Sequence, residues 1–177
     1  MAAVRSIKKL DAEALWNYAL RILGDRAHSA AELRRKLVLK AESPPDVTAV
    51  MARLGEYQLT DDKKFSESFA SSRLANQGHG RFRVLRDLRS KQVPSTVAEK
   101  AVSQTFAGTD EAQLADNYLR RKYRGKDLGP FLREEKNLAS AYRRLRTAGF
   151  SSHMALAVLN KYSGCGEDWD VGDEEAE

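Results

Sequence analysis

Cysteine, histidine and proline are scarce in this sequence of 177 residues. Because Cys165 is the only cysteine, no disulfide can form within the chain, which is typical of a reducing compartment. The histidines His28, His79 and His153 stand far apart, without a second histidine or cysteine at metal-site spacing, so no zinc site is expected. With 4 prolines, a sequence in which alanine, leucine, arginine, glutamate and lysine recur favours helices over strands.

Long apolar runs are also missing. No stretch is long enough to span a membrane, and the first ten residues lack the apolar segment of a secretory signal. We therefore expect a cytoplasmic protein with no membrane association. Hydrophobic residues make up 42% of the chain and charged residues 31%, and the mean hydropathy is -0.57. These values predict an elongated body with several small cores.

Motifs of catalysis and cofactor binding are not found either. Gly125-Lys126 lacks the other residues of a phosphate loop, and Gly78-His79-Gly80 is too short for a dinucleotide fingerprint, so both are interpreted as turns. Asp61 and Asp62 directly precede a predicted helix, where carboxylates cap free amides, which is a plainer role than acid–base catalysis. We expect no enzyme, no cofactor and no metal.

Apolar residues recur at spacings of three and four along most of the chain, which predicts short amphipathic helices. Three such helices in residues 1–59 are followed by a similar group in 60–108 and a looser one in 109–163. The predicted fold is all-α, an elongated tandem array of three three-helix repeats. Arrays of this kind present extended binding surfaces more often than catalytic pockets.

Local signals place several helix ends. Ser29 and Glu32 form a capping box, in which each side chain bonds the other residue's backbone amide. Asp61 or Asp62 is expected to cap the first helix of the second repeat. Gly149 is expected to end a helix of the third repeat.

The middle repeat contains a strongly basic helix after Gly78-His79-Gly80. We expect Phe82, Leu85 and Leu88 of this helix to face the core. Arg83 and Arg86 are expected to point away from it.

The charge is unevenly distributed. The net charge is +5 and the isoelectric point about 9.3, yet the segment after Tyr162 contains seven acidic residues and no lysine or arginine. Without these seven charges the body carries about +12, which favours binding to a polyanion or an acidic protein surface. Residues 164–177 are expected to form a disordered acidic tail, which either keeps the protein soluble or occupies the basic surface.

Cations occur in all three repeats, and arginine, which binds phosphates and carboxylates through a forked group, dominates. The alternative is an ordinary solvated surface with pairs four residues apart, such as Glu32 with Lys36 and Asp87 with Lys91. The candidate binding residues are Arg34, Arg35, Lys36, Arg81, Arg83, Arg86, Arg89, Lys91, Arg120, Arg121, Lys122, Arg143 and Arg144.

Two other stretches of the sequence resemble a known protein family. Tyr18-Ala19-Leu20-Arg21-Ile22-Leu23 resembles the first repeat of the RecX family, and Leu59-Thr60-Asp61-Asp62-x-x-Phe65 resembles its second. The resemblance covers about residues 15–106 well and the remainder more loosely. The chain departs from the family at Gln92-Val93, where a Gly-Ile or Gly-Val pair is usual, and in residues 124–136, which look inserted or rearranged.

The resemblance implies a curved array and a non-enzymatic regulator of RecA recombinase. Such a protein binds the RecA nucleoprotein filament and restrains its growth, ATP hydrolysis, strand exchange and co-protease activity in recombination and DNA repair. The expected partner is the RecA filament, with single- or double-stranded DNA as a further candidate, and the expected state is a monomer. The alternative function is a helix-turn-helix-like DNA-binding module, in which one helix such as Arg81 to Lys91 enters the major groove.

Overall fold

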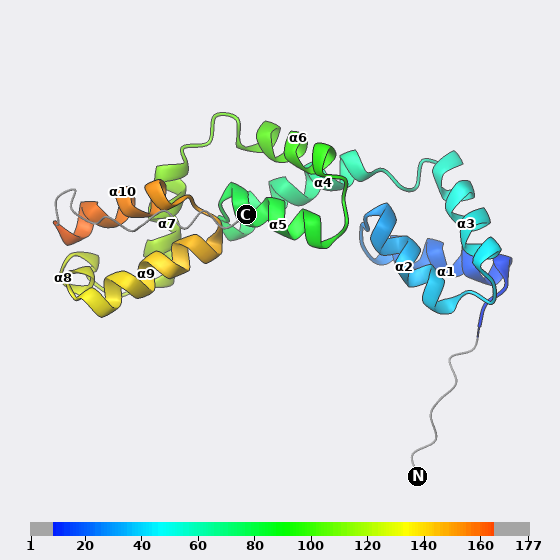
Figure 1. The fold of residues 1–177 in the computed structure, drawn as a ribbon, viewed down its shortest axis with the longest axis horizontal. Helices are drawn as coiled ribbons and strands as arrows, with labels where there is room; N and C mark the ends of the chain where they lie inside the picture. Colours follow the sequence, from blue (N-terminus) through cyan, green and yellow to red (C-terminus); the bar gives the residue numbers. More distant parts are fainter. Residues whose placement is uncertain (1–8, 165–177) are drawn as a thin grey trace, which may run out of the picture. The chain divides into compact units, whose positions relative to one another are not determined.

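The protein is helical throughout the region that the structure describes. The computed structural model describes residues 9–164, and within this range it contains ten α-helices, one π-helix and no β-strand (Figure 1). The all-α prediction is thus confirmed, whereas the predicted acidic tail lies outside the described residues from position 165 on. The helices are α1 (Ala12–Asp25), α2 (Ala30–Lys40), α3 (Pro44–Glu56), α4 (Asp62–Ser72), η1 (Arg73–Gln77), α5 (Arg81–Ser90), α6 (Ser95–Phe106), α7 (Glu111–Lys122), α8 (Leu128–Arg133), α9 (Glu135–Ala148) and α10 (Ser152–Ser163).

Backbone contacts divide the described chain into two compact units. The first comprises the residues up to Ser71 together with Leu85–Thr105, and the second comprises Ser72–Val84 together with the residues from Phe106 on. In chain order the helices still form the groups α1 to α3, α4 to α6 and α7 to α10. The unit boundaries therefore divide the second group, and the repeat limits at 59 and 108 stay a prediction.

In the first unit, α1, α2 and α3 pack around one apolar core. In α1, Leu15, Ala19 and Ile22 follow the predicted spacings of three and four and are buried, and they share this core with Leu33 and Leu37 of α2. The start of α1 is fixed by the Asp11 side chain, which accepts a hydrogen bond from the amide of Ala14. Spacings of three and four thus gave the correct core side of these helices.

The prediction for α5 was partly wrong. Leu88 is fully buried as expected and Leu85 is partly buried, but Phe82 is 53% exposed. The buried positions are instead Val84 and Leu88, four residues apart on one side of the helix. Because each residue turns the helix by about 100°, Phe82 lies about 200° from Val84 and faces solvent.

The second unit has its own core, formed by α7, α8, α9 and α10. The segment 124–136, expected to be inserted or rearranged, contains the short helix α8, so this group has four helices. Asp127 caps it by accepting from the amide of Gly129. Leu128 and Leu132, four residues apart, are both buried in the core, which explains why this short segment forms a helical turn.

Two glycines let the start of α5 approach the end of α9 in the second unit. Gly149 ends α9 with a left-handed backbone (φ 93°), as predicted. The amide of Gly80 donates to the Ala148 carbonyl at 2.9 Å, and the amide of Phe82 donates to the Gly149 carbonyl at 3.2 Å. A Cβ on Gly80 would lie 2.3 Å from the Gly149 oxygen, so a larger residue would force this backbone contact apart.

Candidate functional site

The thirteen predicted binding residues are divided between the two units. Arg34, Arg35 and Lys36 lie on α2 in the first unit, as do Arg86, Arg89 and Lys91 at the end of α5 and after it. Arg81 and Arg83 at the start of α5, the α7 residues Arg120, Arg121 and Lys122, and the α9 residues Arg143 and Arg144 belong to the second unit. Each unit is therefore considered separately.

Several of these cations are held by groups of their own unit. The closest ion pairs join Arg81 to Glu111 at 2.6 Å and Arg120 to Asp116 at 2.7 Å. The remaining contacts are Arg89 with Glu99 at 3.6 Å, Arg83 with the Thr147 carbonyl at 3.4 Å, and Arg121 with the Gln77 carbonyl. These side chains stabilise their units, and a partner would have to compete with the existing contacts.

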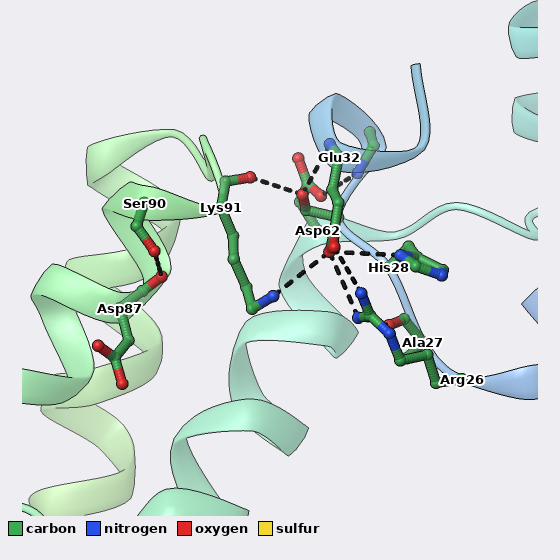
Figure 2. Close-up of polar contacts among 10 residues, drawn as sticks. Arg26, Ala27, His28, Glu32, Asp62, Asp87, Ser90 and Lys91 are labelled. Carbon is green, nitrogen blue, oxygen red and sulfur yellow. Dashed lines mark hydrogen bonds and ion pairs between the residues drawn. The ribbon is translucent and has the colours of Figure 1, made fainter. Parts of the chain in front are cut away.

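Lys91 takes part in the most buried polar cluster of the first unit (Figure 2). The centre of the cluster is Glu32, whose side chain is only 9% exposed. Its carboxylate accepts from Arg26 at 2.6 Å and from Lys91 at 3.4 Å, and it lies 3.3 Å from Nδ1 of His28. The predicted pairing of Glu32 with Lys36 is therefore wrong, and the Lys91 ammonium points inward.

The cluster shifts two titrating groups. Burial would raise the pKa of the Glu32 carboxyl, but the hydrogen bond from Arg26 and the charge of Lys91 outweigh it and lower the pKa to about 2. Burial, helped by the nearby charge of Arg26, lowers the pKa of His28. At neutral pH Glu32 is thus charged and His28 is neutral.

Hydrogen bonds between side chains and backbone groups at the start of α2 also connect this helix to Lys91 and to Asp62. Ser29 caps the helix by accepting from the Glu32 amide at 3.1 Å, as predicted, and its hydroxyl donates to the Lys91 carbonyl at 2.6 Å. The other half of the predicted capping box was wrong, because the Glu32 side chain binds Arg26 and Lys91 and not the Ser29 amide. Asp62 accepts from the amide of Ala30 at 2.8 Å. Asp61 accepts from the amides of two residues in the first turn of α4. The two aspartates therefore cap different helices, which sequence spacing alone did not indicate.

The exposed part of α2 is more accessible. Arg34 and Arg35 are exposed, and the ion pairs found among residues 9–164 involve neither of them. Next to them Val38 and Leu39 are 55% and 63% exposed. An open groove of about 290 Å³ borders Arg34 and Val38. Sequence reasoning missed these apolar residues, although two adjacent apolar residues after the buried Leu37 cannot both face the same core.

In the second unit the basic residues lie against aromatic rings. Arg121 and Lys122 are 5.8 and 5.6 Å from the ring centre of Tyr118. Arg144 of α9 is 5.8 Å from the ring of Tyr123, the residue that ends α7. Cations held over aromatic faces gain about 0.5–1 kcal/mol at exposed sites and stay available to anions. Arg143 is exposed as well.

Lys126 was not among the predicted residues. Its ammonium lies 4.3 Å from the ring centre of Phe131, and the rings of Phe131 and Tyr123 are 5.1 Å apart. The signal available in the sequence was the lysine and arginine content of residues 120–126, but the pairing with Phe131 depends on the unexpected helix α8.

The described region contains no candidate for a metal-binding group or for a membrane-spanning helix. Between residues 9 and 164, no three histidine, cysteine, aspartate or glutamate side chains are grouped so that they could hold a metal ion. In the same range, each helix is too short or too polar to cross a bilayer.

Comparisons with known proteins identify the relatives of this chain. Two family models match it, "RecX, first three-helix domain" over residues 16–54 and "RecX, second three-helix domain" over residues 61–102. A regulatory protein RecX from Mycobacterium sp. (strain JLS) is 32% identical over 145 residues, which cover 80% of this chain and 78% of that protein. The chain belongs to the RecX family.

Further relatives agree with this assignment. Regulatory protein RecX from Chlorobaculum tepidum is 31% identical over 120 residues, covering 68% of this chain and 72% of that protein. The crystal structure of RecX from Lactobacillus salivarius, at 16% identity, covers 87% of this chain and 97% of that chain with a TM-score of 0.66. A second RecX crystal structure gives a TM-score of 0.65 at 21% identity over 83% of this chain and 72% of that chain. The predicted family and its three-helix fold are thus confirmed, and the family is one of regulatory proteins.

Proposed function

We propose that this RecX-family chain is a non-enzymatic regulator that binds the RecA nucleoprotein filament. In this role it limits filament growth and restrains ATP hydrolysis, strand exchange and co-protease activity. It would act as a monomer in the cytoplasm during recombination and DNA repair.

The observation that carries the proposal is the presence of accessible arginine pairs in both units. The exposed pairs are Arg34 and Arg35 in the first unit and Arg143 and Arg144 in the second. None of the four takes part in the ion pairs found among residues 9–164. Their guanidinium groups suit phosphates and carboxylates, both of which a nucleoprotein filament offers. Two weak contacts on one chain strengthen each other, because the first raises the effective concentration for the second.

Regulation without catalysis requires selective binding. A protein that binds one form of the filament better than the others shifts the filament toward that form, whereas equal affinity for all forms shifts nothing. If the preferred form is unable to extend or to turn over ATP, both activities fall together. No bond in the filament has to be broken.

The recognition-helix alternative receives less support from α5. Its cations Arg81 and Arg89 are paired with Glu111 and Glu99, and Lys91, directly after the helix, is directed toward Glu32. A helix that reads base edges needs such side chains to be available in the major groove. We therefore favour contacts spread over both units.

The test mixes the purified protein with preformed RecA filaments on single-stranded DNA and measures co-sedimentation and ATP turnover. We expect Arg34→Glu/Arg35→Glu and Arg143→Glu/Arg144→Glu each to weaken co-sedimentation about tenfold or more, because losing about 1.4 kcal/mol of contact energy is a factor of ten. The matched control is Lys63→Glu/Lys64→Glu, which changes the net charge equally on two exposed lysines outside the proposed surface.

Two results would contradict the proposal. Co-sedimentation of the unaltered protein without any effect on ATP turnover would reduce its role to association. Equal losses for all three double variants would show that only the total charge matters and that the named arginines are not the contact residues.

A further inference from the structure

A distinctive surface that includes the proposed contact residue Arg144 lies at the end of α7 in the second unit. It consists of Tyr123, Lys126, Phe131 and Arg144, and we refer to it as the aromatic–cation surface. Two cations lie over two rings that also contact each other, at 4.3 Å for Lys126 and 5.8 Å for Arg144. Both cations are exposed, and both rings are partly exposed.

The segment that carries Tyr123 and Lys126 is basic, and the nearby carboxylates of Asp127 and Glu134 accept hydrogen bonds from the Gly129 amide and the Asn137 side chain. Residues 120–126 contain five arginines and lysines and no carboxylate. Of these, Arg120 is paired with Asp116, but the ion pairs within residues 9–164 do not include Lys126 or Arg144. The surface therefore suits a ligand that combines several carboxylates with an apolar or aromatic group.

The chain itself contains such a segment. Residues 165–177 include seven carboxylates, no lysine or arginine, and one tryptophan, Trp169. This composition complements the aromatic–cation surface both in charge and in aromatic character.

The described end of α10 is close to α7. Arg120 lies 5.8 Å from the ring centre of Tyr162, whose hydroxyl donates to Asp116 of α7. Tyr123 is three residues beyond Arg120, less than one helical turn of about 5.4 Å along the axis. The chain leaves α10 at Gly164, two residues after Tyr162. Since each residue can span about 3.3 Å, the thirteen residues that follow reach about 40 Å, which is ample for the aromatic–cation surface.

We infer that the acidic segment 165–177 binds the aromatic–cation surface of its own chain and competes there with polyanionic partners. Its carboxylates pair with Lys126 and Arg144, and the indole of Trp169 packs against Tyr123 and Phe131. A short tether gives an effective concentration of about 1 mM, so a contact with a dissociation constant of about 0.1 mM would be formed in about nine molecules out of ten. A competing ligand would then bind about tenfold more weakly than to the unoccupied surface.

The test uses Trp169 as reporter in full-length protein carrying Trp16→Phe, and measures quenching of its fluorescence by the neutral quencher acrylamide. At low salt we expect quenching about two- to threefold weaker than at 0.5 M NaCl, because salt screens the ion pairs. Lys126→Glu/Arg144→Glu should give the stronger quenching already at low salt. The matched control Arg34→Glu/Arg35→Glu, in the first unit, should leave the protection unchanged.

A second measurement covers the case in which Trp16→Phe unfolds the first unit. With Cys165→Ser and Ala176→Cys, a nitroxide at position 176 reports its mobility by its spectral line shape, and the same charge reversals should increase that mobility. If the protection of Trp169 from acrylamide depends on protein concentration, the segment binds a second copy of the chain, and the inference is overturned. Equal quenching in all variants and at both salt concentrations would also overturn it. Neither readout involves RecA, so these results do not depend on the proposed function.

Discussion

Replacing Glu32 by glutamine tests the buried cluster at the start of α2. The substitution preserves the shape of the side chain and removes its charge. In the folded protein Glu32 binds Arg26 and Lys91 and lies beside His28, which is almost fully buried. The amide can accept from one of these donors, but Lys91, whose side chain is 23% exposed, loses its counter-charge.

The magnitude follows from the shifted pKa. A carboxyl whose pKa falls from 4.5 to about 2 favours its charged form in the folded state by about 3 kcal/mol. Water around the half-exposed Arg26 screens part of this attraction. We therefore expect Glu32→Gln to lower the free energy of unfolding of the first unit by about 2 kcal/mol, and its Tm by about 8–16 °C.

The dependence on pH gives the sharper signature. Because the folded pKa lies below the unfolded value of 4.5, the stabilisation is complete above about pH 5 and is lost as the pH falls toward 2. The two proteins should therefore differ in stability at pH 7 and converge near pH 2.

The assay is urea unfolding of the first unit, followed by the fluorescence of Trp16 in a Trp169→Phe background. The control is Glu13→Gln, which removes an exposed carboxylate paired with Arg53 at 3.5 Å and should leave the midpoint nearly unchanged. If Glu32→Gln and Glu13→Gln shift the midpoint equally at pH 7, or if Glu32→Gln is as acid-sensitive as the unaltered protein, the reasoning about the cluster is refuted.

Two further predictions concern packing and are measured by thermal unfolding. Gly80→Ala should destabilise the second unit by more than about 2 kcal/mol because its Cβ would meet the Gly149 oxygen, whereas Gly24→Ala, with no atom within 4 Å of the new Cβ, should stabilise α1 by up to about 1 kcal/mol. Leu88→Ala should cost about 2–5 kcal/mol, and Phe82→Ser less than about 0.5 kcal/mol; equal costs would contradict the observed burial in α5.

Features set by neighbouring residues could be predicted from the sequence. The core stripe of α1, the cap at Ser29 and the left-handed end of α9 at Gly149 each depend on side chains within a few positions. The family resemblance around Tyr18 and Asp61 could also be recognised from the sequence, and the two family models match the ranges 16–54 and 61–102 that contain them.

Features that depend on distant partners could not be predicted. Glu32 has a lysine four residues away, yet it binds Lys91, 59 residues along the chain. Likewise, nothing near Gly80 in the sequence indicates its contact with Gly149. The burial of Phe82 was wrongly predicted for a related reason. The start of α5 is held by hydrogen bonds to the end of α9, and this contact determines which residues of α5 face the core.

The contacts of Lys91 affect how binding experiments on this chain must be interpreted. Lys91 was predicted as a contact residue, but its ammonium and its carbonyl are both bound to the start of α2. A Lys91→Glu variant would place two carboxylates side by side in a buried cluster and destabilise the first unit. Weaker filament binding by that variant would therefore be no evidence for direct contact. At Arg34 and Arg35, which lie on the exposed part of the same helix, a loss of binding at unchanged Tm can be assigned to the surface itself.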